Sequence, residues 1–311
     1  MRPIIAELYT RRQSYVFCGA GPRPAAASQS AHFFRKPLRP ASLSGSNDLE
    51  EFSAIFKLSV LASSSSGNST LVATERTRLL VDAGLSRKET FERLKAVDVA
   101  PESLTAILIT HEHSDHIAGL QVIAKKLDIP IYVSRLTAPA IPWPEDFTPK
   151  IECFAAGSSF PIGDIDVTSF TIPHDAVDPV GFTFRSQGIK IAIATDLGYM
   201  PDSVRFHLRD TNIMLLESNH ALEMLKVGPY PWSIKQRIMG RMGHLSNDVA
   251  CAFIKNDLDT SISTLILGHL SAHNNHPALV EQCAHQALEG RRLFTDLVVA
   301  EPNLPAGPFV L

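Results

Sequence analysis

The sequence predicts an α/β protein in which two β-sheets pack face to face and helices cover their outer sides. Along most of the chain, strand-like segments alternate with helix-like ones. The strand-like segments show either alternating apolar and polar residues or a short apolar run. Some strand pairs are separated only by a turn, as in hairpins, while others are separated by a helix. With 311 residues, 45% of them hydrophobic, the chain is long enough to bury the hydrophobic cores that such layers need.

The composition also excludes several classes of protein. No apolar run approaches the roughly 20 residues that cross a bilayer, so we expect no membrane protein. None of the four cysteines lies in a C-x-x-C pair. Scattered single cysteines favour separate, mostly buried thiols in a reducing compartment over a disulfide scaffold or a zinc ribbon. We therefore expect a cytoplasmic globular protein.

Residues 1–53 differ in composition from the rest of the chain. Residues 1–47 hold seven basic side chains and one acid, so their net charge is +6. Because the whole chain has a net charge of −3, the remaining residues carry −9. We expect residues 1–53 to be a disordered basic extension and residues 54–311 to form the folded domain. A targeting segment, or a start assigned too early, stays open as an alternative. Because the domain is acidic, nucleic-acid binding would need a local basic patch.

The first half of the domain begins with strands. Alternation over residues 56–61 predicts a strand, and a polar loop at residues 63–69 leads to the next one. Ser86 is placed to cap a helix, a second helix is predicted over residues 117–127, and residues 139–161 are Pro-rich and irregular. The other strands expected in this half are residues 70–74, 78–82, 106–110 and 131–134.

The second half combines a hairpin with alternating strands and helices. Residues 180–185 and 190–196 are expected to pair across a turn at Gly188. Apolar runs at residues 212–217 and 264–268 predict buried strands. The remaining predicted elements are strands at residues 166–172 and 297–300 and helices at residues 201–209, 233–239, 246–258 and 277–288.

The most informative motif is the run His111–His116, with the sequence HEHSDH, directly after a predicted apolar strand. Its imidazoles and carboxylates need polar partners, and a divalent metal supplies one. His111 and His113 can point to one side of the strand end. The turn into a helix then presents Asp115 and His116 to a second centre. One short loop can therefore provide ligands for two metals.

Three further candidate ligands follow later predicted strands, at His174, Asp196 and His269. Functional side chains tend to collect at strand ends and on loops. Each of these residues alone would be an ordinary strand-end residue, but three of them beside the His-rich run indicate one common site. The candidate metal ligands are His111, His113, Asp115, His116, His174, Asp196 and His269.

Together with Asp82 before it and these three residues after it, the run His111–His116 resembles the motif set of the metallo-β-lactamase superfamily, over about residues 54–311. The resemblance implies a four-layer αβ/βα sandwich with two divalent metals at one sheet edge. Zinc is the preferred metal and manganese the alternative. Asp82 would orient the cluster without binding metal. The implied ligands are His111, His113 and His174 for the first metal, Asp115, His116 and His269 for the second, and Asp196 as a bridge.

Further segments resemble the bacterial YycJ/WalJ group of DNA exonuclease-like hydrolases. These segments are Ser64–Ser69, Glu217–His220, Tyr230–Trp232 and Gly243–Asn247. Ala221 departs from the group's pattern, which has Asp there, and puts one contact beside the metal site in doubt. This resemblance, with the helix cap expected at Ser246, suggests a set of substrate-binding residues. They are Ser66, Asn68, Asn219, His244, Ser246 and Asn247.

The expected function is that of a metal-dependent hydrolase. It would act as a phosphodiesterase or exonuclease on nucleic acid, with DNA favoured, through a metal-bridging hydroxide. The expected catalytic residues are Asp115, Asp196 and His244, the last as a proton donor to the leaving oxygen. The segment Lys226–Asn247 holds four basic residues and no acid. With its aromatic residues it can bind a single strand, or it can be an ordinary solvated helix.

Two other functions remain open. A thioester or lactone hydrolase can use the same binuclear site, and a basic segment far from the metals would favour it. A non-catalytic regulatory module with a structural metal is the second alternative, although structural zinc sites are closed by four ligands and seven candidates imply an open site. The sequence does not determine whether the substrate is DNA or RNA, whether cleavage is exonucleolytic or endonucleolytic, or what the oligomeric state is.

Overall fold

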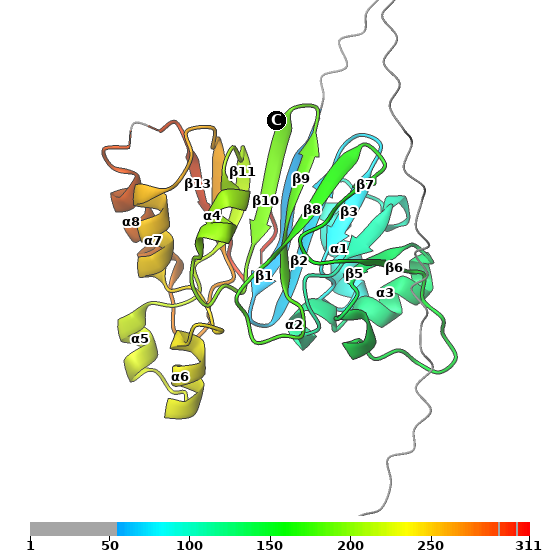
Figure 1. Ribbon diagram of the computed structural model, residues 1–311, viewed down its shortest axis with the longest axis horizontal. Coiled ribbons are helices and arrows are strands. Elements are labelled where there is room, and N and C mark those ends of the chain that lie inside the picture. Colours follow the sequence, from blue (N-terminus) through cyan, green and yellow to red (C-terminus); the bar gives the residue numbers. More distant parts are fainter. Residues whose placement is uncertain (1–54, 292, 303) are drawn as a thin grey trace, which may run out of the picture. The chain divides into compact units, whose positions relative to one another are not determined.

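The computed structural model describes residues 55–311, apart from residues 292 and 303, and these residues form two β-sheets with helices on their outer faces (Figure 1). The extension expected over residues 1–53 lies outside the described residues. Within the described part of the chain, no helix is long and apolar enough to cross a membrane.

Seven strands form the first sheet. They are β1 (Lys57–Ser64), β2 (Gly67–Ala73), β3 (Arg78–Val81), β4 (Ala106–Leu108), β5 (Ile131–Ser134), β6 (Ile151–Phe154) and β14 (Ala306–Val310). Their spatial order is β14-β1-β2-β3-β4-β5-β6. The strands from β3 to β6 are parallel, whereas β1 pairs antiparallel with both of its neighbours.

The second sheet also has seven strands. They are β7 (Ser159–Ile162), β8 (Ile165–Thr171), β9 (Val180–Ser186), β10 (Ile189–Ala194), β11 (Ile213–Glu217), β12 (Thr264–Gly268) and β13 (Asp296–Val299). Their order is β13-β12-β11-β10-β9-β8-β7. The strands from β10 to β13 are parallel, and β9 pairs antiparallel with β10 in the predicted hairpin.

Helices form the two outer layers. The first sheet is connected through α1 (Arg87–Ala96), α2 (Ser114–Ile117) and α3 (Leu120–Leu127), and the second through α4 (Asp202–Leu208), α5 (Leu222–Val227), α6 (Trp232–Met239), α7 (Asn247–Asn256) and α8 (Pro277–Leu288). The predicted caps are confirmed, because the side chains of Ser86 and Ser246 accept hydrogen bonds from the N–H groups of Glu89 and Val249.

Three hydrophobic cores separate the four layers. Successive side chains of a strand point to opposite faces, so Ile191 and Ile193 of β10 pack between the sheets while Ala192 and Ala194 face α4, α7 and α8. A third core lies between the first sheet and the helices α1 and α3. Figure 1 shows these helices on opposite outer sides. The predicted four-layer αβ/βα sandwich is therefore confirmed.

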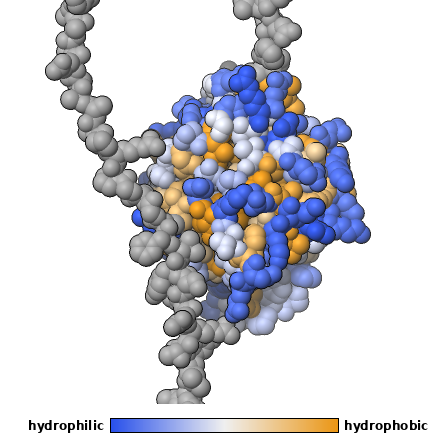
Figure 2. Space-filling view, turned by 90° about the vertical axis from the view of Figure 1, so that its right-hand side faces the viewer, coloured by the Kyte–Doolittle hydropathy of each residue, from blue (hydrophilic) through white to orange (hydrophobic). Residues whose placement is uncertain are grey.

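The outer side that carries α1 and α3 is largely hydrophilic, with hydrophobic side chains between the polar ones (Figure 2). The helix α3 shows the reason. Leu120, Ile123 and Ala124 are buried against the sheet, whereas Lys125 and Lys126 are exposed. The apolar stripe of such a helix packs on the core, and the opposite stripe stays in water.

The helix expected over residues 117–127 is interrupted at Gly119. The N–H of Gly119 donates to the carbonyl oxygen of Ala83 over 2.8 Å, and a Cβ at this position would lie 1.9 Å from the carbonyl oxygen of Leu85. Close approach of two backbones requires glycine here. This contact fixes α2, and with it the His-rich run, against the chain that follows β3.

The polar loop expected over residues 63–69 is mostly strand. Pairing of β1 with β2 continues to Ser64 and Gly67, which leaves only Ser65 and Ser66 in an exposed turn. Hydrogen bonds to the strand partners satisfy the backbone of these polar residues, so the run of serines does not need to form a loop.

Several edge elements were not predicted. The segment expected to be irregular over residues 139–161 contains β6 and β7, and β14 and α5 were not expected at all. Edge strands bury few side chains, so their hydrophobic period is weak. In β6 only Phe154 is buried, and in β14 no side chain is.

The expectation of separate thiols is wrong for at least two of the four cysteines. Cys251 of α7 and Cys283 of α8 form a disulfide, with their Cα atoms 6.3 Å apart. The two helices pack side by side in one outer layer, and this contact brings together two cysteines that are distant in the sequence.

Candidate metal centre

The candidate ligands gather at one edge of the sandwich, where strands of both sheets end. The run His111–His116 lies between β4 and the end of α2, while His174, Asp196 and His269 follow β8, β10 and β12. Since β8, β10 and β12 all run in the same direction, their carboxyl ends meet at one edge. The fold therefore brings together all seven residues that were predicted as ligands.

Three residues at these strand ends have a left-handed backbone. The φ angles are 61° at Asp82, 61° at Asp196 and 57° at His269. Residues other than glycine adopt this conformation at a cost of about 1–3 kcal/mol. It also occurs away from the site, at Asp98, Asp128, Gln187 and Asp210. The chain therefore turns abruptly after β10 and β12 at the residue whose side chain enters the site, and after β3 at Asp82, which supports a ligand from outside it.

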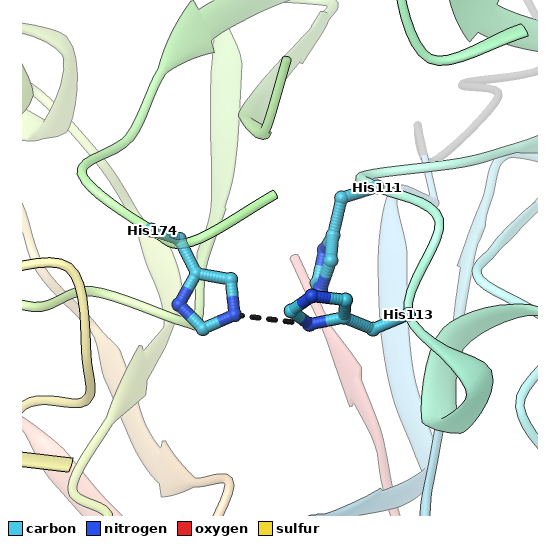
Figure 3. A group of neighbouring side chains, drawn as sticks. All are labelled: His111, His113 and His174. Carbon is cyan, nitrogen blue, oxygen red and sulfur yellow. Dashed lines mark hydrogen bonds between the residues drawn. The ribbon is translucent and has the colours of Figure 1, made fainter. Parts of the chain in front are cut away.

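The first donor group consists of His111, His113 and His174 (Figure 3). One loop supplies His111 and His113, and His174 faces them from the loop after β8. The distance from His113 Nδ1 to His174 Nε2 is 3.2 Å. Two nitrogens that bind one tetrahedral zinc at about 2.0–2.1 Å lie roughly 3.3 Å apart, so this spacing fits a metal.

The outward nitrogens of these rings show where the inward lone pairs point. His113 Nε2 donates to the carbonyl oxygen of Asp175 over 3.2 Å, and His174 Nδ1 donates to the carbonyl oxygen of Gly243 over 3.0 Å. In neutral rings the two inward nitrogens are then both unprotonated. Their lone pairs repel each other at 3.2 Å, and a cation between them removes that repulsion.

The second donor group consists of Asp115, His116 and His269. Asp115 Oδ2 lies 3.4 Å from His116 Nε2 and 3.7 Å from His269 Nε2. Both rings direct their outward nitrogen, Nδ1, to a carboxylate: His116 to Asp82 over 2.8 Å and His269 to Glu217 over 2.9 Å. Metal-binding imidazoles show this arrangement, because the outward bond fixes the tautomer.

Asp196 lies between the two donor groups. Its Oδ1 is 3.7 Å from His174 Nε2 and 3.6 Å from His269 Nε2, and its Oδ2 is 3.4 Å from His116 Nε2. Among the described residues, Asp196 Oδ2, His269 Nε2 and His111 Nε2 have no hydrogen-bond partner although all three are buried. Buried polar atoms rarely stay unpaired, so these orphaned donor atoms fit bound metal.

Asp82 contacts the cluster from behind, whereas Asn68 contacts two of its inward donor atoms, and the predicted contact of Asn68 with substrate stays a prediction. Asp82 Oδ1 accepts a hydrogen bond from the N–H of Thr110, and Asp82 Oδ2 pairs with His116. Asn68 Nδ2 lies 3.2 Å from Asp115 Oδ2 and 3.1 Å from His116 Nε2. The geometry agrees with the role expected for Asp82, which contacts the outer nitrogen of a ligand and not the site itself.

Glu217 is a functional residue that the sequence analysis did not identify. This fully buried carboxylate ends β11, and its Oε1 accepts from His244 Nδ1 over 2.8 Å and from His269 Nδ1 over 2.9 Å. Its Oε2 accepts from the N–H groups of Leu197 and Leu245. A carboxylate at the end of an apolar strand, as at Asp82, is the signal that was available in the sequence.

The electrostatics of the two donor groups differ. Burial lowers the pKa of His111 and of His174, so these rings remain neutral donors. Burial also opposes charge at His269, but Asp196 and its other acidic neighbours raise the pKa of that ring to about 10. Although burial alone would raise the pKa of Asp196, the imidazoles of His269 and His116 hold it well below its usual range. The carboxylate-rich group thus favours positive charge, as a divalent metal provides.

The residues predicted to bind substrate fall into two sets. Ser66 is exposed in the β1–β2 turn and His244 is half-buried beside the donor groups. Asn219 and Asn247 are 2% and 5% exposed, and their amides are occupied by His269 O and by Asn275 Oδ1. The geometry favours a structural role for these two amides, and their contact with substrate stays a prediction.

The expected anion site at the start of α7 is largely occupied by the protein itself. The N–H of Asn247 donates to the carbonyl oxygen of His220, and the N–H of Val249 donates to Ser246 Oγ. Only donors left free at a helix start attract an anion. Ser246 therefore serves as a cap, and its contact with substrate also stays a prediction.

The basic segment Lys226–Asn247 borders the metal centre. Arg237 Nε lies 2.5 Å from Asp175 Oδ2, and Asp175 Oδ1 lies 3.5 Å from His174 Nε2. Its cations are less available than the sequence suggests. The buried ammonium of Lys235 donates to the carbonyl oxygen of Lys226, and Lys226 itself pairs with Glu223.

Removal of metal is expected to destabilise the protein. A metal that binds only the folded state stabilises it by about 4 kcal/mol when supplied at 1,000 times its Kd, or roughly 8–16 °C in Tm for a domain of this size. Thermal unfolding with and without a chelator measures the change, and re-addition of zinc or manganese should restore the higher Tm. Identical melting curves after complete metal removal would contradict a metal centre here.

A comparison with protein families defines the class of this chain. A family model described as "Beta-lactamase superfamily domain" matches residues 77–269, which include the strand ends described above. The chain belongs to this superfamily. The solved structure of Zn(2+)-bound PqqB from Methylobacterium extorquens shares the fold, with a TM-score of 0.60 and 16% identity over 81% of this chain and 99% of that chain.

More similar relatives narrow the family further. The chain is 40% identical over 238 residues to Exodeoxyribonuclease YycJ of Bacillus anthracis, covering 74% of this chain and 88% of that protein. It is 38% identical over 249 residues to Exodeoxyribonuclease WalJ of Streptococcus pneumoniae, covering 78% and 91%. The predicted resemblance to the YycJ/WalJ group is confirmed.

Proposed function

We propose that this protein is a metal-dependent exodeoxyribonuclease that hydrolyses phosphodiester bonds at the end of a DNA strand. The observation that carries the proposal is the pair of donor groups joined by Asp196, in a chain 38–40% identical to two proteins named exodeoxyribonuclease. The basic segment beside Asp175 supports a polyanionic substrate over a thioester or a lactone. A DNA substrate also supports a cytoplasmic location.

The proposed centre holds two divalent metals, with zinc favoured and manganese as the alternative. His111, His113 and His174 would hold the first, Asp115, His116 and His269 would hold the second, and Asp196 would contribute to both. Metals in such a pair polarise the phosphoryl oxygens and lower the pKa of bound water. A regulatory module with a structural metal is not favoured, because seven donors exceed the four that close a structural site.

His244 is the proposed proton donor to the leaving oxygen. Its Nδ1 hydrogen-bonds to Glu217 Oε1 over 2.8 Å, and its ring centroid lies 5.1 Å from that of His174 and 5.2 Å from that of His269. Glu217 fixes the tautomer of His244 and stabilises the ring when it is protonated, as a buried carboxylate does beside a catalytic imidazole. The same carboxylate orients His269.

Cleavage of end-labelled single- and double-stranded DNA and RNA, with zinc or manganese, tests the proposal. We expect stepwise shortening of DNA from one end, which also gives the polarity. Cleavage of RNA in preference to DNA, or internal cuts without shortening from an end, would correct the substrate or the mode of attack. Turnover of a thioester or lactone without any cleavage of nucleic acid would contradict the proposal.

A further inference from the structure

The turn between α6 and α7 packs against the loop that follows β10. A Cβ at Gly198 would lie 2.1 Å from the carbonyl oxygen of Arg241, so the two backbones touch at this point. Gly198 comes two residues after Asp196, and its N–H donates to the carbonyl oxygen of Pro173, directly before His174. The turn therefore meets the rim of the metal centre at Arg241.

An aromatic ring holds the side chain of Arg241. The guanidinium carbon lies 4.2 Å from the centroid of the Tyr199 ring, which is the geometry of a cation–π contact. Leu197 and Met200, on either side in the sequence, are buried in the core between the second sheet and its helices. Tyr199 is only half-buried and Arg241 is exposed, so the ring fixes a cation at the surface.

Two connections along the chain limit the distance from this cation to the metal centre. Tyr199 follows Asp196 by three residues, which span at most about 11 Å of extended chain. Arg241 precedes Gly243 by two residues, or at most about 7 Å, and the carbonyl oxygen of Gly243 accepts from His174 Nδ1. Arg241 therefore lies close both to Asp196 and to the first donor group.

The charge of Arg241 is free to bind a ligand. In the basic segment, Lys226 and Arg237 pair with carboxylates, and the ammonium of Lys235 donates to a backbone carbonyl. Arg241 forms no ion pair within the part of the chain that the structure describes. A cation–π contact uses the face of the guanidinium and leaves the N–H groups at its edge free to donate. An anion can therefore bind at that edge.

We propose that Arg241 binds a backbone phosphate of the DNA substrate near the bond that is cut, and that Tyr199 positions its guanidinium. The inference rests on the proposed function and adds a substrate-binding residue to it. The planar fork of an arginine matches the oxygens of a phosphate. A thioester or a lactone has no neighbouring phosphate, so this contact selects a polyanion over those substrates.

The test compares an end-labelled DNA strand with bis(p-nitrophenyl) phosphate, whose single phosphate occupies the metal centre and leaves Arg241 without a ligand. We expect Arg241→Met to lower the ratio of kcat/KM for DNA to that for the small ester. The expected decrease is roughly 10- to 150-fold, the effect of one lost charge-assisted hydrogen bond. Arg241→Lys should recover part of the ratio, because it keeps the charge but not the fork.

Arg185→Met is the matched control. This exposed arginine stands near the end of β9, whereas Val180, at the start of the strand, pairs with Thr171 beside the metal edge. The control removes one positive charge from the opposite end of the sheet and should leave the ratio as it is. A loss as large as that of Arg241→Met would show that only the net charge matters and would overturn the proposed contact.

Variants of Tyr199 test its positioning role. Tyr199→Leu removes the ring and should lower the same ratio by roughly 2- to 5-fold, the effect of one exposed cation–π contact. Tyr199→Phe keeps the ring and should preserve the ratio. An equal loss in Tyr199→Phe would overturn the positioning role of the ring.

The salt dependence of binding tests the phosphate contact without turnover. Binding of a labelled DNA strand to the Asp196→Asn variant can be followed by fluorescence anisotropy. Each phosphate contact adds about 0.7–0.9 to the slope of log Kd against the logarithm of the salt concentration. Addition of Arg241→Met should lower the slope by about this amount, and an unchanged slope would overturn the proposal.

The inference and the proposed function can fail separately. Normal kcat/KM of Arg241→Met for both DNA and the small ester would overturn the inference alone. An equal loss on both substrates would show that Arg241 only supports the metal centre and would also overturn it. If the unmodified protein hydrolyses the small ester but no DNA, the proposed function fails and the inference with it.

Discussion

Replacement of Asp196 by asparagine is expected to lower kcat/KM for a single-stranded DNA end by more than about 100-fold, the upper range for loss of a contact that only supports a metal ligand. Asp196 carries one carboxylate oxygen toward His174 and His269 and the other toward His116. An amide keeps the size of the side chain, but its nitrogen cannot bind metal. The variant therefore loses the charge that links the two donor groups.

Metal content and cleavage should be measured on the same preparations of this variant. We expect less than the normal amount of bound metal and nearly no shortening of an end-labelled strand, with a folded circular dichroism spectrum. Asp202→Asn is the matched control, because this aspartate of α4 is 98% exposed and, among the described residues, forms an ion pair with Arg205 alone. Full activity of the Asp196 variant would rule out the bridging role.

Replacement of Glu217 by glutamine is expected to reduce metal affinity or kcat by about 10- to 100-fold. Each carboxylate oxygen of Glu217 accepts two hydrogen bonds. Oε1 accepts from His244 and His269, and Oε2 accepts from the N–H groups of Leu197 and Leu245. In either orientation a glutamine would direct its NH₂ group at two N–H donors. The unfolding free energy should also fall by about 1–3 kcal/mol, since buried donors lose their partner.

The pH profile of kcat, measured together with the metal content, distinguishes a positioning role of Glu217 from a merely structural one. We expect this profile to change, because the variant removes a buried negative charge: burial opposes ionisation of Glu217, but His244 lowers the pKa of this carboxyl to about 2. Glu92→Gln on the exposed side of α1 is the control. An unshifted profile with normal metal content would assign Glu217 to stability alone.

The metal ligands could be predicted because they are local in sequence or stand at strand ends. His111, His113, Asp115 and His116 lie in one run, and the apolar strands before Asp196 and His269 are easy to recognise. Glu217 also ends an apolar strand, but the sequence does not show that its side chain supports His244 and His269 instead of binding metal. Its role arises only when β10, β12 and the turn before α7 come together around it.

The misplaced elements share a physical cause, which is contact between segments distant in the chain. Gly119 divides a helix because the backbone at Leu85 lies against it. The serines near Ser64 are strand because β1 pairs with β2 there. The number of cations free to bind a ligand in the segment Lys226–Asn247 could not be predicted for the same reason, since only the fold shows that the ammonium of Lys235 donates to a backbone carbonyl.

Both donor groups draw their members from opposite sheets. His113 comes from the first sheet and His174, 61 residues later, from the second. Asp115 and His269 span the sandwich in the same way. Bound metals would therefore cross-link segments that are far apart in the chain, and because the site exists only when both sheets are in place, the binding free energy would stabilise the assembled sandwich. In this fold the catalytic ions would also tie the two halves of the polypeptide together.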